Sequence, residues 1–189
     1  MEETVKKSID AHRDCLKYLS DNAERLKEIA SIFINSLENK GKILFMGNGG
    51  SAADSQHLAA ELVGRFKNNR PSLAAIALTT DTSILTAVGN DFGFEEVFAR
   101  QIESLGNSQD IVVGISTSGK SKNVIRAVKK AKSLGLRTIG FLGGNGGDLG
   151  SIVDIPFTIS TTDTPRIQEM HILAGHIICE IVERHFMQK

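Results

Sequence analysis

The sequence has no net charge, no long apolar run and few cysteines, and each of these absences argues against a class of protein. Its 189 residues carry 22 basic and 22 acidic side chains, so no net charge attracts the chain to a nucleic acid or to a membrane surface. Its apolar runs all fall short of the roughly 20 residues that a membrane helix needs, and the charged N-terminus does not resemble a signal peptide. Cysteine occurs only as Cys15 and Cys179, which we expect to be reduced and buried. We therefore predict a cytoplasmic protein that binds neither nucleic acid nor membrane.

Short apolar runs alternate with helical patterns from residue 42 onward. Short strands that are apolar throughout, with helices between them, indicate a parallel sheet covered on both faces. We therefore predict a single domain over residues 1–189, an α/β three-layer sandwich with a five-stranded parallel sheet within residues 41–189. The runs predicted to form strands are Ile43–Met46, Leu73–Leu78, Ile111–Ile115, Thr138–Leu142 and Ile155–Ile159. The helical patterns lie near residues 51–64, 81–89, 94–105, 120–134, 145–151 and 165–187.

Two amphipathic helices are predicted ahead of the sheet, in residues 1–40. The sequence Ser20-Asp21-Asn22 divides them and supplies candidates for the N-cap of the second helix. Gly41 is the glycine expected just beyond the C-terminus of that helix. We expect this helical segment to pack against another subunit.

The loops that follow the predicted strands are expected to share one edge of the sheet, where doubly wound α/β proteins bind ligands. These loops comprise residues 47–51, 79–82, 116–121 and 143–147. The last of them belongs to a glycine-rich stretch, Gly143–Gly150, for which a plain loop is favoured over a moving lid.

The stretch GNGGSA, residues 47–52, follows the first predicted strand and opens a helix, an arrangement typical of an anion site. It also matches the G-x-G-x-x-A pattern of dinucleotide-binding proteins. That pattern requires an acidic residue about 20 positions further on to hold the ribose, but the region here contains Lys67–Arg70 and then Thr79-Thr80. Because the acid is missing, a small phosphosugar held by Asn48 and Ser51 is the better interpretation.

The stretch GISTSGKS, residues 114–121, matches the P-loop pattern of nucleotide-binding proteins. Three consecutive hydroxyl side chains stand where a P-loop relies on backbone N–H groups, and no clear strand ends in a magnesium-binding aspartate. Asp91-Phe92-Gly93 matches the kinase magnesium motif, but the other kinase motifs are missing. An ordinary serine-capped helix also explains residues 116–121, although we favour a hydroxyl-rich cradle for one phosphate monoester.

Two helical segments carry side chains that can bind a metal or transfer a proton. His57 and Glu61 are four residues apart on one helix face, a spacing that more often gives a surface pair than a metal site. The last predicted helix carries Gln168, His171 and His176. Gln168 and His176 are separated by about 12 Å along that helix and by about 80° around it. One metal is within reach of both only through a long, bent side chain or through a second subunit, so spacing alone favours a core or solvent-facing side chain for His176.

Four segments in this order resemble the phosphoheptose isomerases of the sugar isomerase (SIS) superfamily: GNGGSAADSQHLAAEL, VGNDFGFEEVFARQIE, ISTSGKSKNV and TPRIQEMHILAGHIICEIVE. The similarity extends over nearly the whole chain. It implies a flavodoxin-like SIS fold preceded by helices, and a homotetramer with active sites between subunits. It also implies conversion of D-sedoheptulose 7-phosphate into D-glycero-D-manno-heptose 7-phosphate, the first step towards ADP- or GDP-activated heptose for bacterial surface polysaccharide such as lipopolysaccharide.

The resemblance also implies roles for individual residues. It places one zinc ion per subunit on His57, Glu61, Gln168 and His176. For an isomerisation through an enediol(ate), we expect Glu61 to act as general base and His176 as general acid. The substrate contacts implied are Asn48, Gly49, Gly50, Ser51, Asn90, Asp91, Ser116, Thr117, Ser118, Ser121 and Gln168.

Two alternatives to this function stay open. A non-catalytic SIS-type binding protein, such as a partner of the bacterial replication initiator, would need the fold but not the acid–base pair. An isomerase of another phosphosugar would share the chemistry, and only the substrate distinguishes it.

Overall fold

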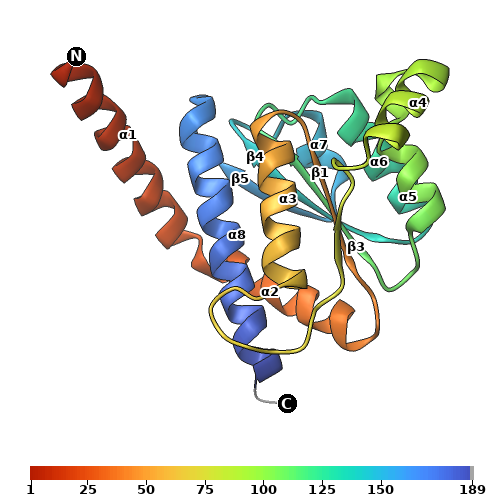
Figure 1. Ribbon diagram of the computed structural model, residues 1–189. Coiled ribbons are helices and arrows are strands. Elements are labelled where there is room, and N and C mark those ends of the chain that lie inside the picture. Colours follow the sequence, from red (N-terminus) through yellow and green to blue (C-terminus); the bar gives the residue numbers. More distant parts are fainter. Residues whose placement is uncertain (188–189) are drawn as a thin grey trace.

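One parallel sheet of five strands divides the structure into layers. The computed structural model describes residues 1–187, and Figure 1 shows helices on both sides of the sheet. The predicted α/β sandwich with a five-stranded parallel sheet is confirmed. The strands are β1 (Ile43–Gly47), β2 (Ala75–Ala77), β3 (Ile111–Ser116), β4 (Arg137–Gly143) and β5 (Ile155–Ile159). The helices are α1 (Glu2–Asp21), α2 (Ala23–Glu38), α3 (Gly50–Val63), α4 (Thr82–Phe92), the 3-10 helix η1 (Phe94–Glu96), α5 (Ala99–Leu105), α6 (Lys122–Ser133), α7 (Gly147–Ile152) and α8 (Thr164–Met187).

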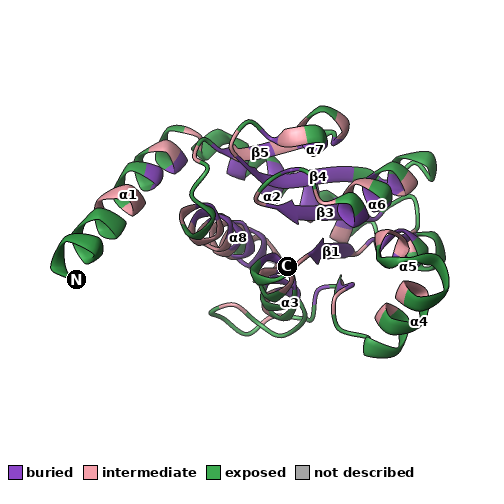
Figure 2. Cartoon of the chain, turned by 90° about the horizontal axis from the view of Figure 1, so that it is seen from above, coloured by how far each residue is buried: buried purple, intermediate pink, exposed green. Residues whose placement is uncertain are grey.

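Alternate residues of the central strands β1, β3 and β4 point to opposite faces of the sheet and contribute to two separate cores. Ile43 and Phe45 of β1 belong to the core that includes α2, α3 and α8. Leu44 and Met46 belong to the core on the other face, with α5 and α6. Figure 2 shows the strands buried and the outer surfaces of the helices exposed. Because the central strands are buried on both faces, they are apolar throughout, and this explains why the unbroken apolar runs predicted a parallel sheet.

The strand order is β2-β1-β3-β4-β5, so the direction of winding reverses between β1 and β3. Gly47 at the end of β1 lies opposite Ile115 of β3, and Ser116 lies opposite Leu142 of β4. The loops after β1 and β3 therefore flank the reversal at the carboxyl edge of the sheet. Sheets with this flavodoxin-like order bind their ligands at that place.

The helices ahead of the sheet differ from the prediction at two boundaries. Asn22 separates α1 from α2, but its side-chain amide donates to the carbonyl of Tyr18 (2.9 Å) and does not cap α2. At the end of α2, Lys40 takes the left-handed conformation with φ 61°, rather than Gly41. A glycine is needed at position 41 because a Cβ there would lie 2.3 Å from the carbonyl oxygen of Gln109. The predicted positions of the break and the glycine are right, whereas their predicted chemistry is wrong.

Two further segments differ from the prediction in length. The helix predicted over residues 94–105 is divided into η1 and α5. The second strand is shorter than the apolar run Leu73–Leu78, because the N–H of Leu73 donates to the carbonyl of Leu62 at the end of α3 (3.1 Å) instead of pairing in the sheet.

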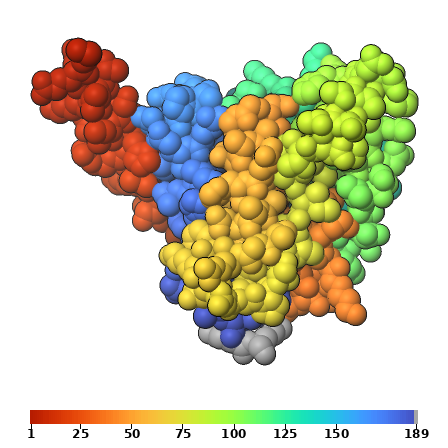
Figure 3. Space-filling model, viewed as in Figure 1, coloured from red at the N-terminus to blue at the C-terminus, as the bar shows by residue number. Residues whose placement is uncertain are grey.

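α1 projects away from the rest of the molecule and contacts α8 (Figure 1, Figure 3). Val5 and Ile9 on α1 are 58% and 54% exposed. The contact with α8 includes a hydrogen bond of 2.6 Å between His12 Nδ1 and Glu169 Oε2. Among residues 1–187, no helix is long and apolar enough to cross a membrane.

Candidate active site

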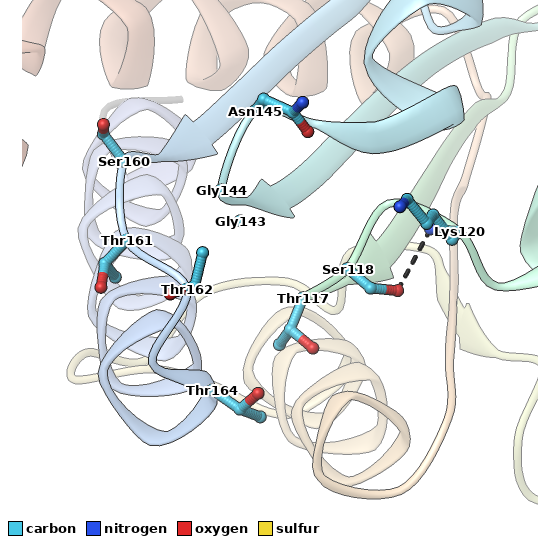
Figure 4. Close-up of a pocket in the computed structure, with 10 residues that line it drawn as sticks. All are labelled: Thr117, Ser118, Lys120, Gly143, Gly144, Asn145, Ser160, Thr161, Thr162 and Thr164. Carbon is cyan, nitrogen blue, oxygen red and sulfur yellow. Dashed lines mark hydrogen bonds between the residues drawn. The ribbon is translucent and has the colours of Figure 1, made fainter.

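A cavity of about 580 Å³ opens at the carboxyl edge of the sheet. Three loops line it, and Figure 4 shows their side chains around the opening. Thr117, Ser118 and Lys120 come from the loop after β3, here called the cradle loop (residues 116–121). The segments 143–145 and 160–164 contribute the opposite wall after β4 and β5. Hydroxyl groups therefore face this cavity from two sides, as a phosphate or sugar site requires.

The cradle loop and the glycine-rich segment after β4 are in contact through their backbones. Gly119 has φ 64°, and a Cβ there would lie only 1.9 Å from the carbonyl oxygen of Gly146. The N–H of Leu149 in α7 donates to the carbonyl of Gly119 (3.0 Å). This contact holds the glycine-rich segment beside the cradle loop, where residues 143–145 form a wall of the cavity. The second half of the predicted loop belongs to α7, which begins at Gly147.

The hydroxyl groups of the cradle loop divide into two sets. Thr117 and Ser118 line the cavity, and the backbone N–H of Lys120 donates to Ser118 Oγ (3.2 Å). Ser116 and Ser121 bond each other instead, with 2.9 Å between their Oγ atoms. Ser121 is the N-cap of α6 but makes no side-chain capping bond, so the first N–H groups of this helix are not used by its side chain. The N–H of Val124 donates to Asn123 Oδ1 (2.9 Å), which leaves the N–H groups of Lys122 and Asn123 at the N-terminus of α6 to attract an anion.

The loop after β1 is joined to the other side of the reversal by a pair of amides. Asn48 Nδ2 donates to Asn123 Oδ1 (2.9 Å), and Asn123 Nδ2 donates to Asn48 Oδ1 (2.8 Å). Gly49 takes φ 56° and precedes the first residue of α3, and Ser51 is buried. Asn123 thereby fixes a predicted substrate residue, although no sequence pattern indicated this pairing.

Three side chains that could hold a metal ion meet where α3 packs beside α8. His57 Nε2 lies 2.8 Å from His176 Nε2 and 3.1 Å from Glu61 Oε1. One ligand atom from each of these residues lies within 4.8 Å of the others. We call His57, Glu61 and His176 the triad. Spacing alone favoured a surface pair and a structural histidine, whereas the packed helices bring all three together.

A glycine allows the two helices of the triad to approach closely. A Cβ at Gly175 would lie 2.4 Å from Cδ2 of Leu58. Gly175 and Leu58 each stand next in sequence to one of the triad histidines. The close contact of α3 with α8 at this point therefore sets the distance between His57 and His176.

Gln168 lies at a different level of α8 from the triad. A Cβ at Gly50 would lie 2.5 Å from Gln168 Nε2, so the Gln168 amide packs against the first residue of α3. Gly50 precedes His57 by seven residues, or about 10 Å along the helix. Within one chain, Gln168 therefore lies near the loop after β1 rather than among the triad.

Burial changes the pKa of groups around the triad. It lowers the pKa of His176, helped by the neighbouring His57, although Glu61 acts in the opposite direction. A neutral imidazole is the form that binds a metal. Burial also raises the pKa of Asp54 to about 6, against the opposing influence of His57. Cys179, whose pKa is raised to about 12 by burial and then by Glu61, stays a thiol rather than a thiolate ligand.

Most of the predicted substrate residues do not line the cavity of their own chain. Thr117 and Ser118 do, and those outside the lining are Asn48, Gly49, Gly50, Ser51, Asn90, Asp91, Ser116, Ser121 and Gln168. Asn90 and Asp91 are exposed near the end of α4, where Asn90 Nδ2 donates to Asp91 Oδ1 (2.8 Å). α4 buries none of its residues, although it carries apolar side chains such as Ile84 and Phe92. Such a helix is typical of a surface that another subunit covers.

Sequence reasoning missed several residues that line the cavity. Lys120 and Asn145 were not assigned to it, nor were Ser160, Thr161, Thr162 and Thr164. A signal for the last four was present, because the hydroxyl-rich run STTDT follows the fifth strand as the cradle loop follows the third. Both runs follow strands of the parallel sheet and therefore lie at its carboxyl edge, and this placement predicts that Ser160, Thr161, Thr162 and Thr164 line the same cavity.

Comparison with known proteins gives consistent similarities. The SIS domain family matches residues 9–143. The phosphoheptose isomerase of Helicobacter pylori (strain P12) is 53% identical over 190 residues, which cover 100% of this chain and 99% of that protein. The solved phosphoheptose isomerase GmhA from Neisseria gonorrhoeae has a TM-score of 0.87 and 44% identity, covering 97% of this chain and 96% of that one. The phosphoheptose isomerase from Francisella tularensis has a TM-score of 0.91 and 36% identity, covering 96% of this chain and 97% of that one.

Proposed function

The chain belongs to the phosphoheptose isomerases, a family of SIS-domain proteins, and we propose that it converts D-sedoheptulose 7-phosphate into D-glycero-D-manno-heptose 7-phosphate. The observation that supports this reaction best is the meeting of His57, Glu61 and His176 on a frame that also carries a hydroxyl-lined cavity. An aldose–ketose isomerase needs acid–base groups at C1 and C2 and a firm hold on the distant phosphate. The triad supports the first requirement and the hydroxyl-lined cavity supports the second.

The isomerisation moves a proton between neighbouring carbons through an enediol(ate). Glu61 is the general base that takes the proton, and His176 is the general acid that serves the sugar oxygens. Thr117, Ser118 and Ser121, with the N-terminus of α6, hold the phosphate. Asn48, Gly49, Gly50 and Ser51 hold the sugar. Binding energy from the phosphate then orients the reacting carbons.

The triad suits one zinc ion per subunit. Two imidazole nitrogens and one carboxylate oxygen form a donor set that is known for catalytic zinc, which leaves a fourth position open. His57, Glu61 and His176 would hold the ion, with Gln168 of another subunit as a further ligand. The ion would polarise the carbonyl and stabilise negative charge on the enediolate. We assign this ligand to another subunit because the Gln168 amide of the same chain packs against Gly50, away from the triad.

The proposed assembly is a homotetramer with active sites between subunits. The loops after β3, β4 and β5 line the cavity of one chain, whereas the triad lies on α3 and α8, and none of its three residues lines that cavity. α4 and α1 are exposed apolar surfaces, and Phe92 of α4 and Val5 of α1 are each more than half exposed. We infer that these helices bury against neighbouring subunits, and that Asn90 and Asp91 of α4 thereby approach a neighbour's substrate.

The product would be the precursor of nucleotide-activated heptose for surface polysaccharide. Both cysteines of the chain are free and buried, which fits a reducing cytoplasm.

Purified protein incubated with D-sedoheptulose 7-phosphate tests the reaction, with the aldose product measured by chromatography. We expect product from the wild type, loss of activity after chelation, and recovery when zinc is restored. Glu61→Gln should lower kcat by about 10²- to 10⁴-fold, whereas Glu103→Gln on the surface of α5 should not. No product from the wild type, or full activity in Glu61→Gln, would disprove the proposed function.

A further inference from the structure

A buried ion pair lies behind the triad, outside all of the predicted site residues. Arg70 follows α3 in the chain and Glu183 lies on α8, with 3.8 Å between Arg70 Nε and Glu183 Oε1. Both side chains are only 1% exposed. Because burying two charges is costly unless they are paired and hydrogen-bonded, their remaining contacts show which parts of the chain the pair holds.

The guanidinium of Arg70 binds carbonyl groups at the C-terminal end of α3. Its Nη2 donates to the carbonyl of Glu61 (2.7 Å), and its Nη1 donates to the carbonyls of Leu62 (2.8 Å) and Gly64 (3.2 Å). The last carbonyls of a helix lack partners within the helix, and a cation is favourable at that end of the helix dipole. Arg70 therefore fixes the last turn of α3, which carries the Glu61 carboxylate.

The carboxylate of Glu183 binds the loop after α3. It accepts hydrogen bonds from the consecutive backbone N–H groups of Phe66 (2.8 Å), Lys67 (2.9 Å) and Asn68 (3.0 Å). Burial alone would raise the pKa of Glu183, but these donors lower it, so the carboxylate stays charged. The loop held in this way places the ring of Phe66 5.4 Å from the ring of His176, measured between centroids.

We propose that Arg70 and Glu183 are positioning residues for the triad. Arg70 positions Glu61 through the end of α3, and Glu183 positions His176 through Phe66. Neither side chain touches the ligand atoms of the triad, so both act through the backbone and through Phe66. The inference rests on the proposed role of the triad as a metal site.

The experiment measures the zinc affinity of the full-length protein by competition with a chromophoric chelator. Glu183→Gln keeps the size of the side chain but removes the charge that three N–H groups share, and we expect zinc affinity to fall by about 10- to 100-fold. Asp110→Asn is the matched control. Asp110 is a buried acid just before β3 that accepts bonds from the backbone N–H groups of Lys42 (2.9 Å) and Asn107 (2.8 Å) and pairs with Lys42 Nζ (2.5 Å). This control should lower thermal stability but leave zinc affinity unchanged.

A second variant covers the case in which Glu183→Gln does not fold. Phe66→Leu leaves every hydrogen bond of Glu183 in place but removes the ring beside His176, and it should weaken zinc binding by several-fold. Zinc affinity equal to wild type in a folded Glu183→Gln, or in Phe66→Leu, would overturn the inference while leaving the metal site intact. Zinc binding by the wild type that is no tighter than in His57→Ala would instead overturn the metal site, and the positioning role with it.

Discussion

The cavity at the carboxyl edge and the triad on α3 and α8 are built by opposite means. Backbone shape forms the cavity, since Gly119, Gly146 and Gly147 all have positive φ and allow two loops to touch. Side chains on two long helices form the triad. The cavity offers many neutral donors, each of them weak, as suits holding a phosphate at a distance from the chemistry. The triad concentrates three strong donors in one place, as suits a metal and a proton transfer.

This difference predicts which changes damage each region. A Cβ added at a loop glycine should damage the cavity. The triad should respond to changes in its own side chains and to a Cβ at Gly175, where α8 approaches Leu58 of α3. The following experiments test the cavity and its surroundings in order of expected effect.

Gly119→Ala should have the largest effect on stability. Its Cβ would lie 1.9 Å from the carbonyl oxygen of Gly146, so the cradle loop and the glycine-rich wall must separate. We expect the free energy of unfolding to fall by about 3–5 kcal/mol, with a loss of phosphosugar affinity. Gly135→Ala is the control, because Gly135 also has positive φ (78°) but open space around its Cβ. Gly135→Ala should lower the free energy of unfolding by only about 1–2 kcal/mol. Urea denaturation that gives the same loss for both variants would contradict the contact between Gly119 and Gly146.

His171 should make stability depend on pH below neutrality. The buried ring has a pKa lowered to about 4 by desolvation, and its Nε2 donates to the carbonyl of Leu142 beside the cavity wall (3.0 Å). Because the folded pKa lies below the ordinary value of 6.5, the contribution of His171 is complete above about pH 6.5 and is lost as the pH falls towards 4. The total loss is about 3 kcal/mol.

Urea denaturation at pH 7.5 and at pH 4.5 measures this loss. His171→Gln should be less stable than wild type at pH 7.5 but should show a smaller decrease between the two pH values. An unchanged decrease in the variant would show that His171 does not titrate in the folded protein.

Thr117→Val should have the smallest effect of the three. The substitution keeps the shape of the side chain but removes one hydroxyl from the cavity, and we expect kcat/KM to fall by about 5- to 30-fold, or about 1–2 kcal/mol. Ser133→Ala at the exposed end of α6 is the control, because the Ser133 hydroxyl bonds only the carbonyl of Lys130 in its own helix. Steady-state kinetics with D-sedoheptulose 7-phosphate measure this change. If kcat/KM is the same for both variants, Thr117 does not contact the phosphate.

The two regions also differ in how far the sequence predicted them. Strand, glycine turn and helix start are local patterns, and they are sufficient to predict that residues 47–52 and the cradle loop share one edge of the sheet. The opposite wall at Ser160–Thr164 was missed because its hydroxyl groups match no named motif. The pairing of Asn48 with Asn123 was missed because it joins two loops far apart in sequence.

The triad was beyond the reach of spacing arguments. His57 and His176 are 119 residues apart, and their meeting depends on Gly175 allowing α8 to approach Leu58. Only the resemblance to phosphoheptose isomerases predicts that these residues act together. Gln168 was grouped with them in the same way, and its place against Gly50 within one chain leaves its role as a ligand to another subunit as a proposal.

The most direct test of a site shared between subunits is complementation between two inactive variants. Glu61→Gln supplies an intact cavity, and a variant with Thr117→Val, Ser118→Ala and Ser121→Ala supplies an intact triad. After the two are unfolded together and refolded as mixed tetramers, we expect about one site in four to combine an intact cavity with an intact triad from different chains and to restore isomerase activity. Mixed tetramers that stay as inactive as either parent would show that each site uses the cavity and the triad of a single chain.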